Sequence, residues 1–289
     1  MENILFRGVC TALVTPFLGD KVNFPLAEIL AKRQIDAGIG ALVLAGTTGE
    51  APTLEDDEKL ELFERCKRYA GADCKIICGT GSNCTAHAAA FSLAAQEAGA
   101  DGLLVVSPYY NKATAEGLVA HYMTVAHCVN IPIIVYNVPG RTGQDIPVDV
   151  YRRLSYLPNI AGVKEAAKDV TKVSAALEGA RPGFCVWSGC DELAVAEIAL
   201  GAQGVISVLS NVLPRETAAM VNAALDGDFD TAAHLQRKLQ PVMDALGAEV
   251  NPIPIKAAMS LAGYDCGPCR LPLTKAKAST VELLKEFIL

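Results

Sequence analysis

The 289-residue sequence has no apolar run long enough to cross a bilayer. Its longest apolar stretches, 102–108 and 131–136, fall well short of the roughly 20 residues that a transmembrane helix needs. The N-terminus also lacks the basic start and long apolar run of a secretory signal. We therefore expect no membrane association and a cytoplasmic location.

Positive charge is scarce as well. The chain has 25 Lys and Arg against 32 Asp and Glu, which gives a net charge of −7 and an isoelectric point near 5.2. No Lys/Arg cluster interrupts this balance, so the basic surface that follows a phosphate backbone is missing. Nucleic acid is therefore not an expected partner. Hydrophobic residues make up 51% of the chain, enough for a large core in a soluble globule.

Clusters of metal-binding residues are absent from the sequence. The four histidines are isolated, and no group of His, Cys, Asp and Glu has the spacing of metal ligands. The ten cysteines are scattered singly, which favours reduced, buried thiols. Cys266 and Cys269 have the spacing of a redox pair but not its strand-to-helix setting, so a redox role stays open. We expect no metal and no organic cofactor.

What the sequence does have is a repeated strand-and-helix rhythm. Short runs of Val, Ile and Leu alternate with longer segments of helical spacing. At three joints, 34–44, 96–106 and 198–206, a glycine ends a small-residue helix just before an apolar strand. The predicted strands cover 8–15, 41–46, 75–80, 102–107, 132–137, 160–165, 184–189 and 204–209.

Eight such units predict an α/β fold, a (β/α)₈ barrel. An open doubly wound sheet is the alternative, but no Gly-x-Gly-x-x-Gly follows the first strand. After about residue 226, strand-like runs stop and helical periodicity continues to the end. We therefore predict a barrel over 1–226 that carries the active site, and a C-terminal helical region of about three helices over 227–289.

In a barrel of this kind, the active site forms where the strands end. Polar residues, with glycines among them, gather at these predicted strand ends. The segments are Thr15, Thr47, Thr48, Gly49, Glu50, Tyr109, Tyr110, Asn111, the segment 136–143, Lys164, Glu165, Ser188, Gly189 and Ser207.

Lys164 is the most unusual of these residues, because it follows the apolar run Ile160–Val163 and would place an ammonium inside the barrel. Burying an unpaired charge is costly, so such a lysine tends to lose its proton. A neutral amine can attack a carbonyl carbon. The alternative is an ion pair with Glu165, although neighbouring residues on a strand point to opposite faces.

The other candidates each have two interpretations. Tyr136, beside Lys164 on the preceding strand, could relay protons or could only pack. Thr47 and Thr48 could bind a carboxylate or cap a helix. Arg141 could hold a carboxylate through its guanidinium fork or lie in a solvated loop.

Three motifs occur in order along the chain: Gly46–Glu50 (GTTGE), Tyr136–Gly143 (YNVPGRTG) and Gly162–Glu165 (GVKE). Together they resemble the dihydrodipicolinate synthase family, and the similarity covers essentially the whole chain. The resemblance implies a carbon–oxygen lyase that condenses pyruvate with L-aspartate 4-semialdehyde to 4-hydroxy-tetrahydrodipicolinate. This reaction belongs to diaminopimelate and lysine biosynthesis and proceeds without a cofactor, through a Lys164–pyruvate imine.

The resemblance also implies residue roles and an assembly. Tyr136, Thr48 and Tyr110 would relay protons, with Tyr110 entering the site of a neighbouring subunit, and the chain would form a homotetramer, a dimer of dimers. Thr47 and Thr48 would bind the pyruvate carboxylate, and Arg141 that of the semialdehyde. Gly189 and Ile206 would line the pyruvate pocket.

Relatives that are inhibited by lysine hold it in a pocket at the dimer interface, where an acid grips the ligand's amine. The resemblance places Ala51, Asp56, Lys59, Asn83, His87 and Tyr109 in this pocket. His87 stands at the position of the acid, and Lys59 adds a positive charge. We therefore expect weak or absent inhibition by lysine.

Two other functions stay open at this point. A pyruvate-dependent sugar-acid aldolase of the N-acetylneuraminate lyase type would share the lysine and the tyrosine, but would not need Arg141. A non-catalytic barrel that binds small acids would have little use for a neutral lysine beside a proton relay.

Overall fold

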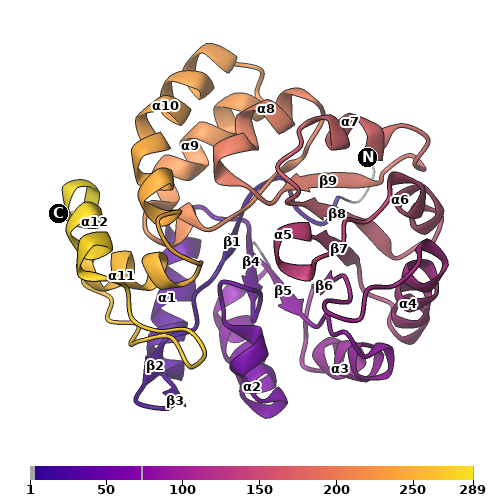
Figure 1. Cartoon of the computed structure of the whole chain (residues 1–289), viewed down its shortest axis with the longest axis horizontal. Helices are drawn as coiled ribbons and strands as arrows, with labels where there is room; N and C mark the ends of the chain where they lie inside the picture. Colours follow the sequence, from indigo (N-terminus) through magenta and orange to yellow (C-terminus); the bar gives the residue numbers. More distant parts are fainter. Residues whose placement is uncertain (1–3, 73, 289) are drawn as a thin grey trace.

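The computed structural model describes residues 4–72 and 74–288. The N-terminal start, on which the expectation about a secretory signal depends, lies partly outside this range. Eight parallel strands close into a barrel (Figure 1), in the spatial order β1-β10-β9-β8-β7-β6-β5-β4. They are β1 (Gly8–Ala12), β4 (Ala41–Leu44), β5 (Lys75–Gly79), β6 (Gly102–Val106), β7 (Ile133–Asn137), β8 (Ile160–Glu165), β9 (Cys185–Ser188) and β10 (Gly204–Ser207). The predicted (β/α)₈ barrel and all eight predicted strands are confirmed.

A ring of helices surrounds the strands (Figure 1). It consists of α1 (Phe24–Asp36), α2 (Asp56–Ala70), α3 (Thr85–Glu97), α4 (Ala115–Cys128), α6 (Val148–Ser155), α7 (Thr171–Leu177), α8 (Ala194–Ala199) and α9 (Pro214–Leu225). Shorter elements lie between them: the hairpin of β2 (Phe17–Leu18) and β3 (Lys21–Val22), the one-turn helix α5 (Pro139–Thr142), and the 3₁₀ turns η1 (Ala51–Thr53), η2 (Asp191–Leu193) and η3 (Leu209–Asn211).

Three further helices follow the barrel, as the sequence predicts. They are α10 (Phe229–Leu246), α11 (Ile253–Leu261) and α12 (Ala278–Ile288). The predicted division at 226/227 falls in the turn between α9 and α10, and that the two parts are separate domains stays a prediction. No helix in the described part of the chain has the length and apolarity needed to cross a membrane.

The glycines at the predicted helix ends adopt the backbone conformation that their positions require. Gly38, Gly99 and Gly201 have φ of +84°, +92° and +109°, a region that is unfavourable for residues with a Cβ. Each of them lets the chain leave a helix and enter a strand that is buried on both faces.

The core has two layers, one inside the barrel and one between the barrel and its helices. The inner layer closes at the amino ends of the strands, where Trp187 stacks on Phe6 with ring centroids 4.9 Å apart. Trp187 Nε1 also donates a hydrogen bond to the Phe6 carbonyl at 3.2 Å. Because these rings fill the interior at this end, the carboxyl ends of the strands are the place to look for a site.

Candidate active site

Lys164 and Tyr136 lie side by side inside the barrel. They are register partners on β8 and β7, and Lys164 Nζ lies 4.3 Å from the centroid of the Tyr136 ring. Both side chains are 6% exposed. A lysine amine and a tyrosine ring are therefore held side by side and largely shielded from solvent, an arrangement that suits imine chemistry.

The ion pair between Lys164 and Glu165 does not form. Glu165 points out of the barrel, where its carboxylate bonds to Asn137 and Tyr151 and lies 3.5 Å from Lys172 Nζ. Within the described part of the chain, no carboxylate oxygen lies within 4.0 Å of Lys164 Nζ. The structural alternative for Lys164 is therefore wrong, because alternation along β8 separates it from Glu165.

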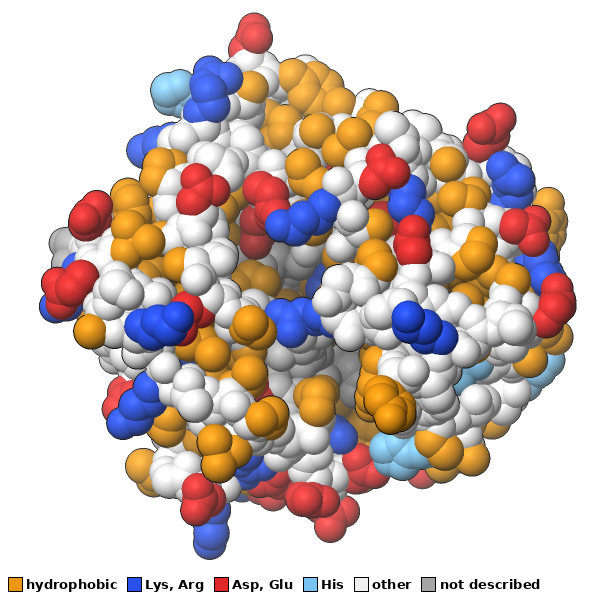
Figure 2. Space-filling model, viewed as in Figure 1, with side chains coloured by type: hydrophobic (Ala, Val, Ile, Leu, Met, Phe, Trp, Pro, Cys, Tyr) orange, Lys and Arg blue, Asp and Glu red, His pale blue; other side chains and the backbone are white. Residues whose placement is uncertain are grey.

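A cavity of about 500 Å³ opens above Lys164, and Figure 2 shows a hollow near the middle of the molecular face with Lys and Arg side chains beside it. The structure brings six of the predicted residues into its lining: Thr47, Thr48, Tyr136, Arg141, Lys164 and Gly189. Ile206 lies in the inner apolar layer of the barrel with Tyr136, at 1% exposure, and is not part of that lining.

Asn251 connects two of these residues and escaped the sequence analysis. Its side-chain Nδ2 donates to Thr48 Oγ1 at 3.0 Å, and its backbone carbonyl oxygen accepts a hydrogen bond from Arg141 Nη2 at 2.9 Å. It lies in the turn between α10 and α11, so no strand end signals it in the sequence. Asn251 therefore orients a threonine hydroxyl and a guanidinium from outside the barrel.

The loop that carries Thr47 and Thr48 is fixed by a buried ion pair. Glu50 ends this loop with a φ of +57°, and its Oε1 lies 2.8 Å from Lys256 Nζ. Its Oε2 accepts a hydrogen bond from the backbone N–H of Arg270 at 2.8 Å. Glu50 and Lys256 are each 3% exposed. The C-terminal helical region thus holds the loop in place.

The cavity has a second polar side that the sequence analysis also missed. Lys168 and Glu192 form an ion pair at 2.9 Å, and both line the cavity together with Asp191. Asp191 Oδ2 accepts hydrogen bonds from the backbone N–H groups of Val208 and Leu209, both at 2.9 Å. Burial raises the pKa of this carboxyl. These residues follow β8 and β9 by a few positions, where the sequence shows no distinctive motif.

A second cavity, of about 430 Å³, adjoins the first. Of the predicted regulatory positions, Ala51, Lys59, His87 and Tyr109 line it. Asp56 lies behind them and bonds to Lys59 Nζ at 3.0 Å and His87 Nε2 at 2.8 Å. Partial burial works against ionisation of Asp56, but the two hydrogen bonds prevail and lower its pKa. Asn83 donates to the Tyr109 carbonyl at 3.2 Å.

Tyr110 is the one predicted relay residue that this chain does not bring to its own site. Its side chain is 92% exposed, and its φ is +72°. It belongs to the lining of neither cavity. An aromatic side chain held outward by strained backbone is typical of a contact with another molecule.

The Cys266–Cys269 pair lacks the properties of a redox site. Burial raises the pKa of Cys266 to about 12 and that of Cys269 to about 11. Reactive thiols have lowered pKa values instead. In the described part of the chain, no group of three or more His, Cys, Asp or Glu is arranged to hold a metal ion.

Comparisons with known proteins agree with this geometry. The profile of the Dihydrodipicolinate synthetase family matches residues 5–288. A 4-hydroxy-tetrahydrodipicolinate synthase of Kosmotoga olearia is 45% identical over 285 residues, covering 98% of this chain and 97% of that protein.

Solved structures with the same fold include complexes with small molecules. A dihydrodipicolinate synthase of Cyanidioschyzon merolae with lysine bound is 37% identical, with a TM-score of 0.95 and coverage of 98% and 97% of the two chains. A chloride-inhibited one of Acinetobacter baumannii in complex with pyruvate is 39% identical, with a TM-score of 0.94 and coverage of 97% of each chain. With its barrel, its buried Lys164 and Tyr136, and similarity along nearly its full length, the chain belongs to the Dihydrodipicolinate synthetase family.

Proposed function

We propose that this chain condenses pyruvate with L-aspartate 4-semialdehyde to 4-hydroxy-tetrahydrodipicolinate, through an imine on Lys164. The observation that carries the proposal is the buried Lys164 amine beside Tyr136 at the carboxyl ends of the strands. Similarity along nearly the full length to a 4-hydroxy-tetrahydrodipicolinate synthase supports the choice of substrates.

The reaction begins when the Lys164 amine attacks the keto carbon of pyruvate to give a carbinolamine. The carbinolamine oxygen leaves as water after it gains a proton, and an imine remains. Loss of a proton from the methyl group gives an enamine, which attacks the aldehyde carbon of the semialdehyde and turns its oxygen into a hydroxyl group. The amino group of the semialdehyde then displaces Lys164 from the imine carbon, which closes the ring of the product and frees the lysine amine. Tyr136 relays these protons with Thr48, whose hydroxyl Asn251 orients, and with Tyr110 from a neighbouring subunit.

The two carboxylates of the substrates have separate partners. Thr47 and Thr48 bind the pyruvate carboxylate, and Arg141 binds that of the semialdehyde with the donors it does not give to Asn251. Gly189 leaves room for pyruvate, because a Cβ there would lie 3.2 Å from Lys164 Cε and 2.6 Å from Ala166 Cβ. Ile206 belongs to the same buried apolar cluster as Tyr136 and supports the pocket from within the barrel.

The mechanism needs no cofactor, since the protonated imine itself withdraws the electrons that leave the methyl group. A sugar-acid aldolase of the N-acetylneuraminate lyase type would use the same lysine and tyrosine. Arg141 in the cavity favours a second substrate with a carboxylate. A non-catalytic acid-binding barrel would not require Lys164 and Tyr136 to be buried side by side.

We place Tyr110 at the centre of a dimer interface, because its exposed ring must enter a partner's site to reach a reacting atom. Two such dimers would form the homotetramer. A cytoplasmic location fits the cysteines, which are scattered singly along the sequence and are mostly buried.

We further propose that lysine inhibits this enzyme weakly or not at all. Lys59 and His87 line the second cavity, and no Asp or Glu occurs among the described residues of its lining. Asp56 is already bonded to both of them. A cationic ligand would therefore enter a cavity without a free carboxylate, which is unfavourable.

Lysine titration of the activity tests this prediction. Millimolar lysine should leave most of the activity, and the double variant Lys59→Ala/His87→Glu should become more sensitive. Lys59→Ala/His87→Gln is the matched control, since it removes the same side chains without adding an acid. Strong inhibition of the unaltered chain would contradict the proposal.

The proposed reaction is tested by reducing the enzyme with borohydride in the presence of pyruvate, with peptide mapping, and by a coupled assay with aspartate semialdehyde. We expect a pyruvate adduct on Lys164 and turnover of the semialdehyde, and neither in Lys164→Arg. An adduct without this turnover would favour the sugar-acid aldolase. An unmodified Lys164 would overturn the imine mechanism.

A further inference from the structure

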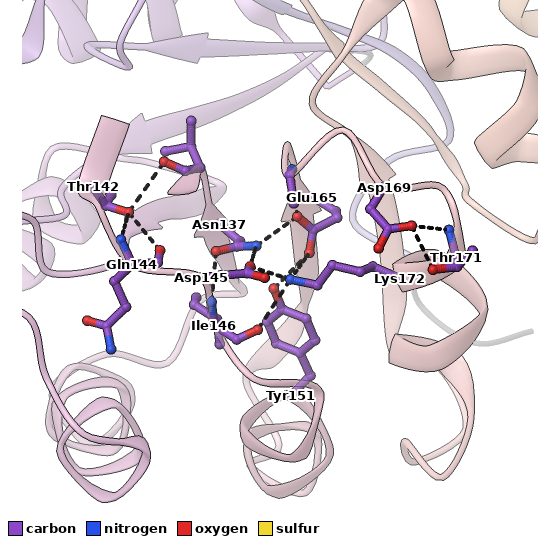
Figure 3. Close-up of polar contacts among 12 residues, drawn as sticks. Asn137, Thr142, Gln144, Asp145, Ile146, Tyr151, Glu165, Asp169, Thr171 and Lys172 are labelled. Carbon is purple, nitrogen blue, oxygen red and sulfur yellow. Dashed lines mark hydrogen bonds and ion pairs between the residues drawn. The ribbon is translucent and has the colours of Figure 1, made fainter. Parts of the chain in front are cut away.

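Behind the strands that carry Lys164 and Tyr136 lies a second polar cluster, on the outer side of the barrel wall (Figure 3). It consists of Asn137, Asp145, Tyr151, Glu165 and Lys172. Asn137, Tyr151 and Glu165 are at most 1% exposed, and Lys172 is 9% exposed. Polar groups are costly to bury unless they are bonded, so a bonded cluster of this size fixes the elements that it joins.

Glu165 joins four segments of the chain through one carboxylate. Its Oε1 accepts hydrogen bonds from Asn137 Nδ2 on β7 at 2.8 Å and from the backbone N–H of Ala167, after β8, at 2.9 Å. Its Oε2 accepts one from the Tyr151 hydroxyl on α6 at 2.8 Å and lies 3.5 Å from Lys172 Nζ on α7. The end of β8 is thereby tied to the neighbouring strand, to two helices and to its own following loop.

Asn137 holds the matching position on β7. Its side-chain Nδ2 also donates to Asp145 Oδ1 at 2.7 Å, and its side-chain Oδ1 accepts a hydrogen bond from the backbone N–H of Ile146 at 3.1 Å. Asn137 and Glu165 are register partners, as are Tyr136 and Lys164, one residue earlier on each strand. Since successive side chains point to opposite faces, Asn137 and Glu165 join β7 and β8 on the outer face, directly beside the inner pair.

The same residue also shapes the cavity wall. The Glu165 carbonyl accepts a hydrogen bond from the Gly189 N–H at 2.7 Å, and the Ala166 N–H donates to the Asn137 carbonyl at 3.0 Å. Ala166 and Gly189 both line the cavity above Lys164. The backbone of Glu165 is therefore bonded to the wall of the cavity, and its side chain anchors the same residue to β7, α6 and α7.

We propose that Glu165 is a positioning residue, which sets the distance between the Lys164 amine and the Tyr136 hydroxyl from outside the barrel. The inference rests on the proposed function, because it concerns the rate at which Lys164 forms its imine. Misplacement of reacting groups by about 1 Å can slow a reaction on the order of 100-fold.

The test compares Glu165→Gln with the unaltered chain in single-turnover imine formation with pyruvate. Glutamine keeps the shape but turns one acceptor into a donor facing Tyr151 and Lys172. We expect imine formation to slow roughly 10- to 100-fold per site. Every site should still form the imine in the end, and the pyruvate KM should change little. A purely structural role would instead lower the number of reactive sites and leave the rate per site unchanged.

Glu197→Gln is the matched control. Glu197 is also a buried carboxylate outside the barrel, 1% exposed, but it lies on α8 behind β9. This variant should keep the rate per site. Tyr151→Phe removes one hydrogen bond to Glu165 and should slow imine formation per site by a smaller factor. If Glu165→Gln does not fold, Tyr151→Phe takes its place as the test of the inference.

If Glu165→Gln, or Tyr151→Phe in its place, folds and forms the imine at an unchanged rate per site, the inference is overturned. It is also overturned if Glu197→Gln slows imine formation to the same extent. In either case, an imine on Lys164 of the unaltered chain would leave the proposed function standing. If the unaltered chain forms no imine at all, the proposed function fails and this inference fails with it.

Discussion

At the level of single residues, side chains alternate between the two faces of β8, and this alternation separates the neighbouring charges of Lys164 and Glu165. Lys164 points into the barrel and Glu165 points out of it. The Lys164 amine therefore has no carboxylate partner among the described residues, whereas Glu165 pairs with Lys172. This separation is readable in the sequence from the period of a strand. The hydrogen bonds of Asn251 are not readable, because they depend on a turn that approaches the barrel from the C-terminal region.

Glu197 provides a residue-scale prediction about pH. Burial raises the pKa of Glu197 to about 7, from the 4.5 of an exposed glutamate. At a pH between 4.5 and about 7, Glu197 is largely deprotonated in the unfolded chain but keeps its proton in the folded chain. The free energy of unfolding should therefore fall as the pH rises through this window, and this contribution should change no further above it.

The variant Glu197→Gln cannot titrate at this position. Its stability relative to the unaltered chain should rise by on the order of 1 to 3 kcal/mol between about pH 5 and about pH 8. Urea unfolding of both proteins measures this difference, in which the titration of all other groups cancels. A difference that does not depend on pH would contradict the assignment.

At the level of elements, the barrel leaves no room for side chains at certain glycines. A Cβ at Gly162 of β8 would lie 2.0 Å from the carbonyl oxygen of Cys185 on β9. Gly162→Ala should force the two strands apart and lower the free energy of unfolding by about 3 kcal/mol or more. Gly40→Ala is the control, because nothing lies within 4 Å of its Cβ position. Thermal unfolding compares the two, and equal midpoints would refute the prediction.

The ion pair between Glu50 and Lys256 connects a barrel loop to α11. Lys256→Met should destabilise the protein by about 3 to 5 kcal/mol, because it leaves the Glu50 charge buried without its cation. The double variant Glu50→Gln/Lys256→Met should recover part of this loss. Denaturant midpoints of the three proteins test the coupling. If the double variant is less stable than Lys256→Met, the destabilisation does not come from the unpaired charge.

Most of the elements could be predicted, because buried strands and glycine-ended helices leave a clear periodic signal. The ring of polar strand ends followed from the geometry of a barrel. Lys168 lies in the loop after β8, and Asp191 and Glu192 lie in the short turn η2 after β9. Neither segment has a periodic pattern, so the place of these residues in the cavity could not be predicted. The Glu50–Lys256 contact joins residues far apart in the sequence, and only the folded chain brings them together.

At the level of the whole molecule, Tyr110 points away from the site of its own chain. If it completes the site of a neighbour, two inactive variants should restore each other. Lys164→Ala retains Tyr110, and Tyr110→Phe retains Lys164. A mixed dimer would contain one site with both intact residues, so random reassortment should restore roughly a quarter of the sites.

Mixing the two variants after mild dissociation, followed by the pyruvate and semialdehyde assay, measures this recovery. A mixture of Lys164→Ala with Lys164→Arg should gain nothing. Activity no higher than the sum of the separate variants would contradict a shared site.

The Glu50 contacts also bear on the order in which the site is assembled during synthesis. The ribosome releases the chain from its N-terminus, so all eight strands emerge before Lys256 and Arg270. Until these two residues arrive, the loop of Thr47 and Thr48 lacks both donors that hold its glutamate. The last part of the chain is therefore needed to fix a loop that lines the cavity, and this loop reaches its final arrangement only after residues 256–270 have been synthesised.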